Sequence, residues 1–136
     1  MPHDPPRGVR IAHIGIAVRA IDQTLPFYRD VLGMRELPLD DADGARIAGL
    51  AAGESLVELL EGVAPESPIA KFVDRRGPGI HHVCFAVDDL EAALARCRAA
   101  GVRLIDESPR VGAEGKRIAF LHPASTGGVL VELTED

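Results

Sequence analysis

The sequence predicts an α+β fold in which two pseudo-repeated βαβββ modules form one curved mixed sheet around a central cavity. The first observation behind this prediction is an internal repeat, which aligns His13 with His82 at an offset of 69 residues. The second is the pair of segments LVELLE and LVELTE, which aligns Glu58 with Glu132 near the end of each half. Such a repeat indicates that the same order of elements occurs twice along the chain.

The segment IAHIGIAV, residues 11–18, is expected to form the first strand, because large apolar residues recur at every second position. One face of this strand carries bulky side chains: Ile14, Ile16 and Val18. The opposite face begins with His13 and continues with small residues. Residues 80–87 repeat this pattern with His82 in the place of His13. Each strand is therefore expected to pack its bulky face against a helix and to leave space beside its histidine.

Three helices are expected between the strands. The first runs from about residue 22 to residue 32, and the third begins after Asp88 or Asp89. Between the two halves, Ser67 is expected to cap a linking helix over about 67–76. A glycine of the kind that ends helices follows each of them: Gly33, Gly77 and Gly101.

Length and composition predict one domain over residues 11–136, made of modules 11–61 and 80–136. Residues 1–10 are expected to form a flexible tail, since three of the first six residues are proline. No apolar run approaches the roughly 18 residues of a membrane span, and the first residues lack an apolar signal segment. A cytoplasmic protein without a membrane partner is therefore expected.

Charge and cysteine content narrow the classes of partner. The formal net charge is −6, which disfavours nucleic acid as a partner because nucleic-acid binding needs a basic surface. Cys84 and Cys97 are expected to be free thiols in a reducing compartment.

Four residues at repeat-equivalent positions are the candidate site: His13, Glu58, His82 and Glu132. If the two halves pair into one sheet, these side chains meet on its inner face. Two imidazoles and two carboxylates suit a divalent metal ion that keeps open positions for water or substrate oxygens. A carboxylate between strong strand formers is also costly to bury without such a partner. His81 is expected on the other face of its strand, with a role in packing or in supporting a ligand.

Longer motifs carry a family resemblance. The segments SPIAKFVDRRGPGIHHVCFAVDD, RLIDESPRVGAEGKRIAFLHP and STGGVLVEL together resemble the methylmalonyl-CoA epimerase family of the vicinal oxygen chelate, or glyoxalase-like, superfamily. FYRDVLGM is typical of the first module in many members of that superfamily. The resemblance extends from about Ile11 to Glu132.

The resemblance implies a dimeric, divalent-metal enzyme that interconverts the 2R and 2S forms of methylmalonyl-CoA. Its metal ligands fall on His13, Glu58, His82 and Glu132, and Glu132 also matches a residue proposed as a catalytic base. The proton on C2 would leave to form an enolate whose charge the metal stabilises, and return on the opposite face. Some family members carry a second glutamate near the position of Ile47, so the second acid/base group is not identified, and His122 or a metal-bound water are guesses for it. Cobalt, manganese, nickel or zinc would each suit the ligands.

The coenzyme A tail of such a substrate needs cationic groups and backbone donors. The two loops near the C-terminal strands offer them, and the residues expected to contact substrate are Lys116, Arg117, His122, Ser125, Thr126 and Gly127.

Other functions compete with this interpretation. Glyoxalase I, a lactoylglutathione lyase, has a very similar fold and metal set, but the SPIAKF and HPASTGGVLVEL segments argue against it. Metal-dependent dioxygenases and thiol transferases of the superfamily use two His and one Glu, so Glu58 counts against them. A metal-free ligand-binding module would have no need for the four candidate ligands.

Overall fold

The computed structural model describes residues 8–135 of the chain. The N-terminal module contains β1 (Arg10–Val18), α1 (Ile21–Pro26), a π-helical turn (Phe27–Val31), β2 (Glu36–Leu37), β3 (Ala45–Ala52) and β4 (Ser55–Gly62). The linking helix is α2 (Pro68–Arg76). The C-terminal module contains β5 (Gly79–Val87), α3 (Leu90–Ala99), β6 (Arg110–Val111), β7 (Arg117–Leu121), a 3₁₀ turn (Pro123–Ser125) and β8 (Val131–Glu135).

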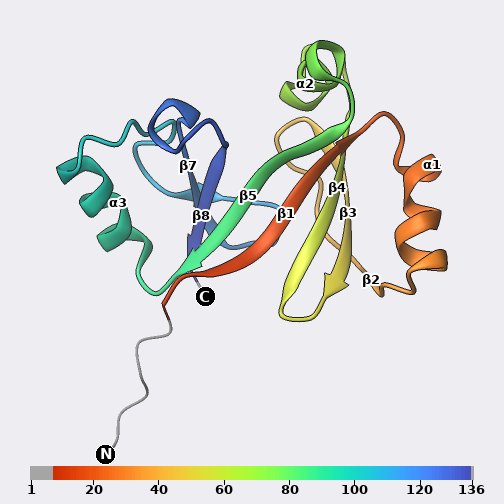
Figure 1. Ribbon diagram of the computed structural model, residues 1–136, viewed down its shortest axis with the longest axis horizontal. Coiled ribbons are helices and arrows are strands. Elements are labelled where there is room, and N and C mark those ends of the chain that lie inside the picture. The colour runs from red at the N-terminus through yellow and green to blue at the C-terminus, as the bar shows by residue number, and fades with distance from the viewer. Residues whose placement is uncertain (1–7, 136) are drawn as a thin grey trace, which may run out of the picture.

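All eight strands of the described chain form one sheet in the order β2-β3-β4-β1-β5-β8-β7-β6. The first strands of the two modules, β1 and β5, run antiparallel at its centre, and each pairs in parallel with the last strand of its own module. Figure 1 shows β1 and β5 side by side along the middle of the curved sheet, with α1 and α3 at its two ends. The predicted α+β fold with two βαβββ modules in a curved mixed sheet is thus confirmed.

Two β-bulges interrupt the central pair of strands. Gly15 pairs with His82 but Ile16 pairs with Ile80, so His81 has no partner in the register. At the other end of the pair the register skips Ala12 in the same way. Because a bulge breaks the alternation of side chains, strict alternation does not hold at these two positions.

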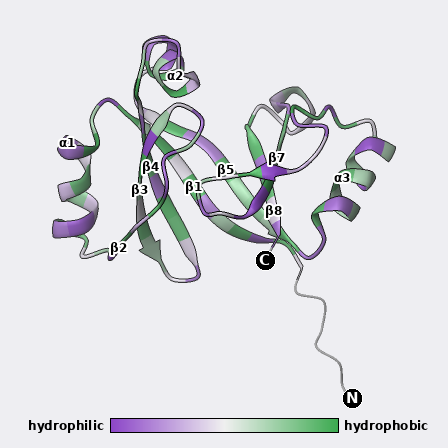
Figure 2. Ribbon diagram, turned by 180° about the vertical axis from the view of Figure 1, so that it is seen from behind, coloured by the Kyte–Doolittle hydropathy of each residue, from purple (hydrophilic) through white to green (hydrophobic). Residues whose placement is uncertain are grey.

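The two outer helices cover the bulky faces of the sheet. Ile21 and Leu25 of α1 pack against Leu50 and Leu59 of the first module. Leu90 and Leu94 of α3 are fully buried in the equivalent cluster of the second module. Both helices turn hydrophilic residues outward (Figure 2). Helix α2 packs on the opposite, inner face of the sheet, where Ile69 and Val73 lie against Ala17 and Leu60.

The predicted helix ends are largely observed. The side chain of Ser67 accepts a hydrogen bond from the Ala70 N–H at the start of α2, and Asp89 caps α3 in the same way. Gly33, Gly77 and Gly101 all have φ near +77° (76°, 78° and 79°), the left-handed conformation that glycine adopts most easily.

The first helix differs from the prediction of one continuous helix over 22–32. Pro26 is the last residue of α1, and the chain continues as a π-helical turn in which Leu32 N–H bonds to Phe27 C=O. Proline has no N–H to donate and crowds the preceding turn, which accounts for the change of hydrogen-bond pattern at this point.

The ends of the expected domain can be compared only in part. Residues 1–7 of the expected tail and Asp136 lie outside the described residues, and Arg10, placed in the tail, already belongs to β1. None of the helices within residues 8–135 combines the length and apolarity that crossing a membrane requires. Cys84 and Cys97 are both free thiols.

Candidate metal centre and active site

Two rows of residues across the sheet position the four candidate ligands. In one row, His13 of β1 pairs with Cys84 of β5, which pairs with Glu132 of β8. In the other, Gly15 of β1 lies between its register partners Glu58 of β4 and His82 of β5. The repeat offset that relates His13 to His82 also relates Gly15 to Cys84. The two rows are therefore pseudo-equivalent, and they place the ligands of both modules on the inner face.

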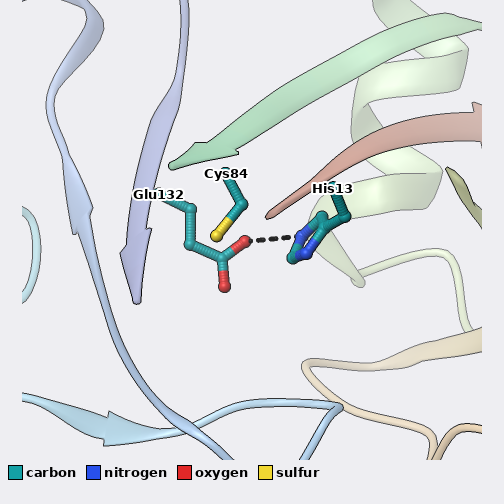
Figure 3. Close-up of side chains that lie close together, drawn as sticks. All are labelled: His13, Cys84 and Glu132. Atoms are coloured by element: carbon teal, nitrogen blue, oxygen red, sulfur yellow. Dashed lines mark hydrogen bonds and ion pairs between the residues drawn. The ribbon is translucent and has the colours of Figure 1, made fainter. Parts of the chain in front are cut away.

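Three donor atoms form a nearly equilateral triangle at the centre of this face. His13 Nε2 lies 3.0 Å from His82 Nε2 and 3.0 Å from Glu132 Oε1, and His82 Nε2 lies 3.0 Å from the same oxygen. Figure 3 shows His13 and Glu132 reaching toward each other, with Cys84 beside them on β5. All three ligand side chains are buried, at 4–5% exposure. The structure thus brings side chains separated by up to 119 residues into direct contact.

Glu58 completes the cluster from the other side of His13. Its Oε2 lies 3.4 Å from His13 Nδ1, and the residue is 3% exposed. Glu114 Oε2 also approaches His13 Nδ1, at 2.8 Å. Neither contact has the geometry of a hydrogen bond, so His13 Nδ1 and Glu58 Oε2 are buried polar atoms without a hydrogen-bond partner. Such orphaned atoms are costly in a protein interior unless another group satisfies them.

His81 does not point away from the site as strict alternation predicts. It is the bulged residue of β5, and its side chain lines the same cavity as that of His82. His81 Nδ1 lies 2.9 Å from His82 Nδ1, and the His81 ring packs edge-on against Phe72 of α2. The expected face was wrong because the bulge re-aims the side chain.

Burial and close contacts shift the pKa values of the clustered side chains. Burial disfavours the charged form of His13, but contacts with Cys84, Glu114 and Glu132 and the charge of Glu58 outweigh it and raise its pKa to about 12. Burial raises the pKa of Glu58 to about 8, although the nearby His13 charge acts against this. For Glu132, burial is outweighed by its contacts with the two histidines, which lower its pKa to about 2. The side chains therefore hold a compact set of positive and negative charges away from water.

A cavity of about 550 Å³ opens above these residues. It is lined by all four candidate ligands, His81 and Glu114, with apolar walls from both modules and α2: Ile47, Leu60, Ile69, Ile105, Ile118, Phe120 and Leu130. This size and lining are typical of a site for a small molecule or for part of a larger one. Ile47 contributes an apolar side chain to this wall.

Of the residues expected to contact substrate, Lys116 lines the cavity. Arg117 instead forms a 2.6 Å ion pair with Glu135, away from the cavity wall. His122 caps the 3₁₀ turn, where its Nδ1 accepts the Ala124 N–H. Ser125 is the last residue of this turn, Thr126 and Gly127 follow it, and none of the three is part of the cavity wall.

The hydroxyl groups of that loop have local partners. Ser125 Oγ accepts the Arg103 N–H, and the Thr126 hydroxyl donates to the Val129 carbonyl. Both hydroxyl groups are therefore engaged by backbone groups of the protein, and neither residue lines the cavity.

Glu114 and Arg110 are cavity residues that the sequence did not single out. Glu114 lies between Gly112 and Gly115 in the turn before β7, where Gly112 N–H bonds to Lys116 C=O. A carboxylate at the tip of a glycine turn usually points to solvent, so no local pattern marks it. Arg110 lies over the Phe120 ring at 5.6 Å and pairs with Asp43 and Asp106. The position of Arg110 depends on contact with Asp43, which lies 67 residues earlier in the chain, so no local pattern marks it either.

The residues present fit a divalent metal ion. Two ligands at right angles on an ion with bonds of about 2.1 Å lie about 3.0 Å apart, which is the spacing of the donor triangle. The donors are imidazole nitrogens and carboxylate oxygens, which suit first-row divalent ions. Two groupings of nearby metal-binding side chains both include His13: one with Cys84 and Glu132, the other with Glu58 and His82. Glu58 Oε2, a buried carboxylate oxygen without a hydrogen-bond partner, lies in the same cluster.

Comparison with known proteins agrees with this fold. Residues 12–120 match the family model of the Glyoxalase/Bleomycin resistance protein/Dioxygenase superfamily. The ethylmalonyl-CoA/methylmalonyl-CoA epimerase of Cereibacter sphaeroides is 37% identical over 130 residues, covering 93% of this chain and 97% of the relative. The chain therefore belongs to this superfamily and, within it, to the family of the methylmalonyl-CoA epimerases.

Solved structures are similar along nearly the whole chain. The methylmalonyl-CoA epimerase of Mycobacterium tuberculosis superposes with a TM-score of 0.88 at 39% identity, covering 99% of this chain and 91% of that one. A methylmalonyl-CoA epimerase in complex with methylmalonyl-CoA and NH4+ superposes with a TM-score of 0.89 at 38% identity, covering 94% of each chain.

Proposed function

We propose that this chain is a divalent-metal-dependent epimerase that interconverts (2R)- and (2S)-methylmalonyl-CoA. The observation that carries the proposal is a buried cluster of two histidines and two glutamates beneath a cavity of about 550 Å³. Each module contributes one histidine and one glutamate to this cluster. Family membership supplies the substrate class, since the relatives named above act on or bind this coenzyme A thioester. His13, Glu58, His82 and Glu132 are the proposed ligands of the metal.

The proposed reaction begins at a C–H bond flanked by two carbonyl-type groups. Carbon 2 of methylmalonyl-CoA lies between a thioester and a carboxylate, so loss of its proton gives an enolate whose charge must be stabilised. A bound divalent ion would supply Lewis-acid stabilisation of that charge, which is worth several kcal/mol. The apolar cavity walls, including Ile69 and Phe120, would keep water away from the reacting carbon.

Glu132 is the proposed base for one face of the substrate. Its carboxylate lines the cavity, is buried, and is held ionised by its contacts with His13 and His82. A base has to be ionised and positioned before it can accept a proton. The group that serves the opposite face cannot be Ile47, which carries no titratable proton.

Recognition of the coenzyme A tail is assigned to the cavity rim. Of the cationic residues that the sequence predicted to contact substrate, Lys116 lines the cavity. Arg110 offers a second positive charge on the same wall, although Asp43 and Asp106 already pair with it. The other predicted contacts, Arg117 and residues 122–127, lie outside the wall of this cavity. A homodimer is the assembly that the family suggests, and light scattering on the purified protein measures it.

One experiment tests the proposal directly. The protein is stripped of metal with a chelator and incubated in deuterium oxide with one stereoisomer of methylmalonyl-CoA, with and without added cobalt, manganese, nickel or zinc. We expect metal-dependent loss of optical purity together with deuterium incorporation at C2. Failure of both in the presence of every metal would overturn the proposal.

The same incubation with the hemithioacetal of glutathione and methylglyoxal distinguishes the main alternative. Turnover of that compound, without turnover of methylmalonyl-CoA, would indicate a lactoylglutathione lyase. A protein that binds no divalent ion would instead be a metal-free binding module.

Replacement of the proposed base gives a sharper prediction. Glu132→Gln keeps the size of the side chain but removes its negative charge and basicity. We expect epimerisation and C2 deuterium exchange to fall by roughly 10²- to 10⁴-fold, the usual contribution of general acid–base catalysis. Glu135→Gln is the matched control, because Glu135 lies on the same strand but binds the Leu90 N–H on the outer face. Exchange at the wild-type rate in Glu132→Gln would remove Glu132 from this role.

A further inference from the structure

The adjacent histidines of β5 play different parts in the site. His82 Nε2 lies in the donor triangle, 3.0 Å from both His13 Nε2 and Glu132 Oε1. His81 has no contact with this triangle but meets the other nitrogen of the same ring, at 2.9 Å between the two Nδ1 atoms. The bulge makes this contact possible, because it turns two consecutive side chains toward one cavity.

A short contact between two imidazole Nδ1 atoms requires one proton between them. One nitrogen must donate and the other must accept. If His81 donated, a neutral His82 would carry its own proton on Nε2 and would have no lone pair to offer a metal. If His82 donates, its proton sits on Nδ1 and its Nε2 lone pair faces the donor triangle.

We propose that His81 is a positioning residue that accepts the Nδ1 proton of His82 and so fixes the metal-binding tautomer of that ligand. This inference rests on the proposed metal centre. Metal-binding histidines generally donate their second ring N–H to a carboxylate, a carbonyl or a water, and the partner orients the ring. In this chain the partner is a second histidine.

The orientation of His81 is itself held by the linking helix. The His81 ring packs edge-on against Phe72 of α2, with ring centres 5.0 Å apart, and edge-on against His82 at 5.2 Å. The equivalent bulged residue of the first module is Ala12, which has no polar side chain. Only the second module can therefore use its bulge in this way.

Two substitutions separate the hydrogen bond from the packing. His81→Phe keeps a flat ring against Phe72 but removes the acceptor. His81→Asn removes the ring but places an amide oxygen near the position of Nδ1. We expect the affinity for Zn²⁺ or Co²⁺, measured by calorimetry on the folded metal-free protein, to fall about 10- to 100-fold in His81→Phe. Affinity should recover substantially in His81→Asn. Phe72→Leu loosens the packing of His81 but keeps its acceptor nitrogen, so its loss of affinity should be smaller than that of His81→Phe.

Nitrogen-15 NMR of the imidazole rings gives a readout independent of activity. In the wild type we expect the proton of His82 on Nδ1 and a metal-shifted Nε2 resonance on addition of Zn²⁺. A proton on Nε2 of His82 in the wild type would overturn the inference. So would wild-type affinity in His81→Phe, or equal losses in His81→Phe and His81→Asn, since equal losses indicate packing.

Different experimental results would contradict the role of His81 and the proposed function. A wild-type protein that binds no divalent ion overturns both. A wild-type protein that binds the ion and epimerises the substrate, with affinity insensitive to His81→Phe, overturns the inference alone.

Discussion

Gly15 is a residue at which the two pseudo-equivalent halves of the site differ. A Cβ atom at this position would lie 2.3 Å from Cε1 and 2.6 Å from Nδ1 of His82. The His82 ring therefore lies directly over the Gly15 backbone, and only glycine leaves room for it. The equivalent position of the second module holds Cys84, whose thiol lies beside His13 instead.

Gly15→Ala is accordingly expected to displace His82. Overpacking of this kind costs about 1–3 kcal/mol of stability, and a displaced ligand should lower metal affinity at least tenfold. Gly79→Ala is the matched control, because Gly79 lies on the neighbouring strand with nothing within 4 Å of the added methyl group and no unusual backbone angle. Calorimetric titration with Zn²⁺ on both variants measures the effect. Equal affinities in the two variants would contradict this account of Gly15.

The sequence predicted the four candidate ligands because each obeys a local rule. Alternation along a strand and the internal repeat were enough to place His13, Glu58, His82 and Glu132 on one inner face. Strand alternation placed His81 on the wrong face, because a bulge depends on how two distant strands pair and not on the composition of either strand. Glu114 was missed for a similar reason: its turn reaches the site only through the curvature of the sheet.

At the scale of elements, the last strand of each module holds the first residue of that module's helix. Glu61 at the end of β4 accepts the Ile21 N–H at 2.7 Å, and Glu135 at the end of β8 accepts the Leu90 N–H at 2.9 Å. Ala20, before α1, provides no side-chain cap of its own. The repeat therefore conserves geometry as well as order, with a carboxylate from a strand at each helix N-terminus, where the helix dipole favours negative charge.

The charge of Glu135 gives a pH-dependent prediction. Its bond to the Leu90 N–H and its pairing with Arg117 lower its pKa, so its contribution to stability is present above the usual carboxyl pKa and is lost as pH falls. Because this side chain is 25% exposed, we expect Glu135→Gln to lower the free energy of unfolding by only about 0.5–1 kcal/mol at pH 7.

Urea unfolding at pH 7 and near pH 3 checks this expectation. The difference between wild type and Glu135→Gln should shrink at the lower pH, because protonation removes the charge of Glu135 first in the unfolded chain and then in the folded one. Glu61→Gln should show a deficit of similar size at pH 7, because it removes the charge at the equivalent helix end. A difference for Glu135→Gln that persists unchanged at low pH would show that the charge is not responsible.

Helix ends were readable from the sequence, whereas the interior of the first helix was not. Ser67, Asp89 and the terminal glycines act through contacts within a few residues, so their patterns predict the observed ends. Pro26 also acts locally, but it can end a helix, kink it or change its hydrogen-bond pattern. Which of these occurs depends on packing against the sheet, where Leu25 is buried and Tyr28 is partly buried.

At the scale of the whole molecule, the site exists only where the two modules meet. The donors lie on the four central strands β4, β1, β5 and β8, two from each module. His13 of the first module contacts Glu132 of the second, and Gly15 of the first accommodates His82 of the second. Neither module alone contains a complete set of ligands, so a metal ion bound here would act as a cross-link between them.

Metal binding should therefore raise the stability of the whole chain. An ion that binds only the folded state at a free concentration of about 100 times its dissociation constant adds about 2.7 kcal/mol, or about 10 °C in Tm for a domain of this size. Thermal unfolding of the chelator-treated protein, with and without Zn²⁺, Co²⁺ or Mn²⁺, measures the shift, and excess chelator should reverse it. His82→Ala should melt at the same temperature in the presence and absence of metal, because the second module then lacks its imidazole ligand. Two results would contradict this account of the cluster as a metal site joining the two modules. One is a wild-type Tm that does not change with any of these ions. The other is a rise in the Tm of His82→Ala as large as that of the wild type.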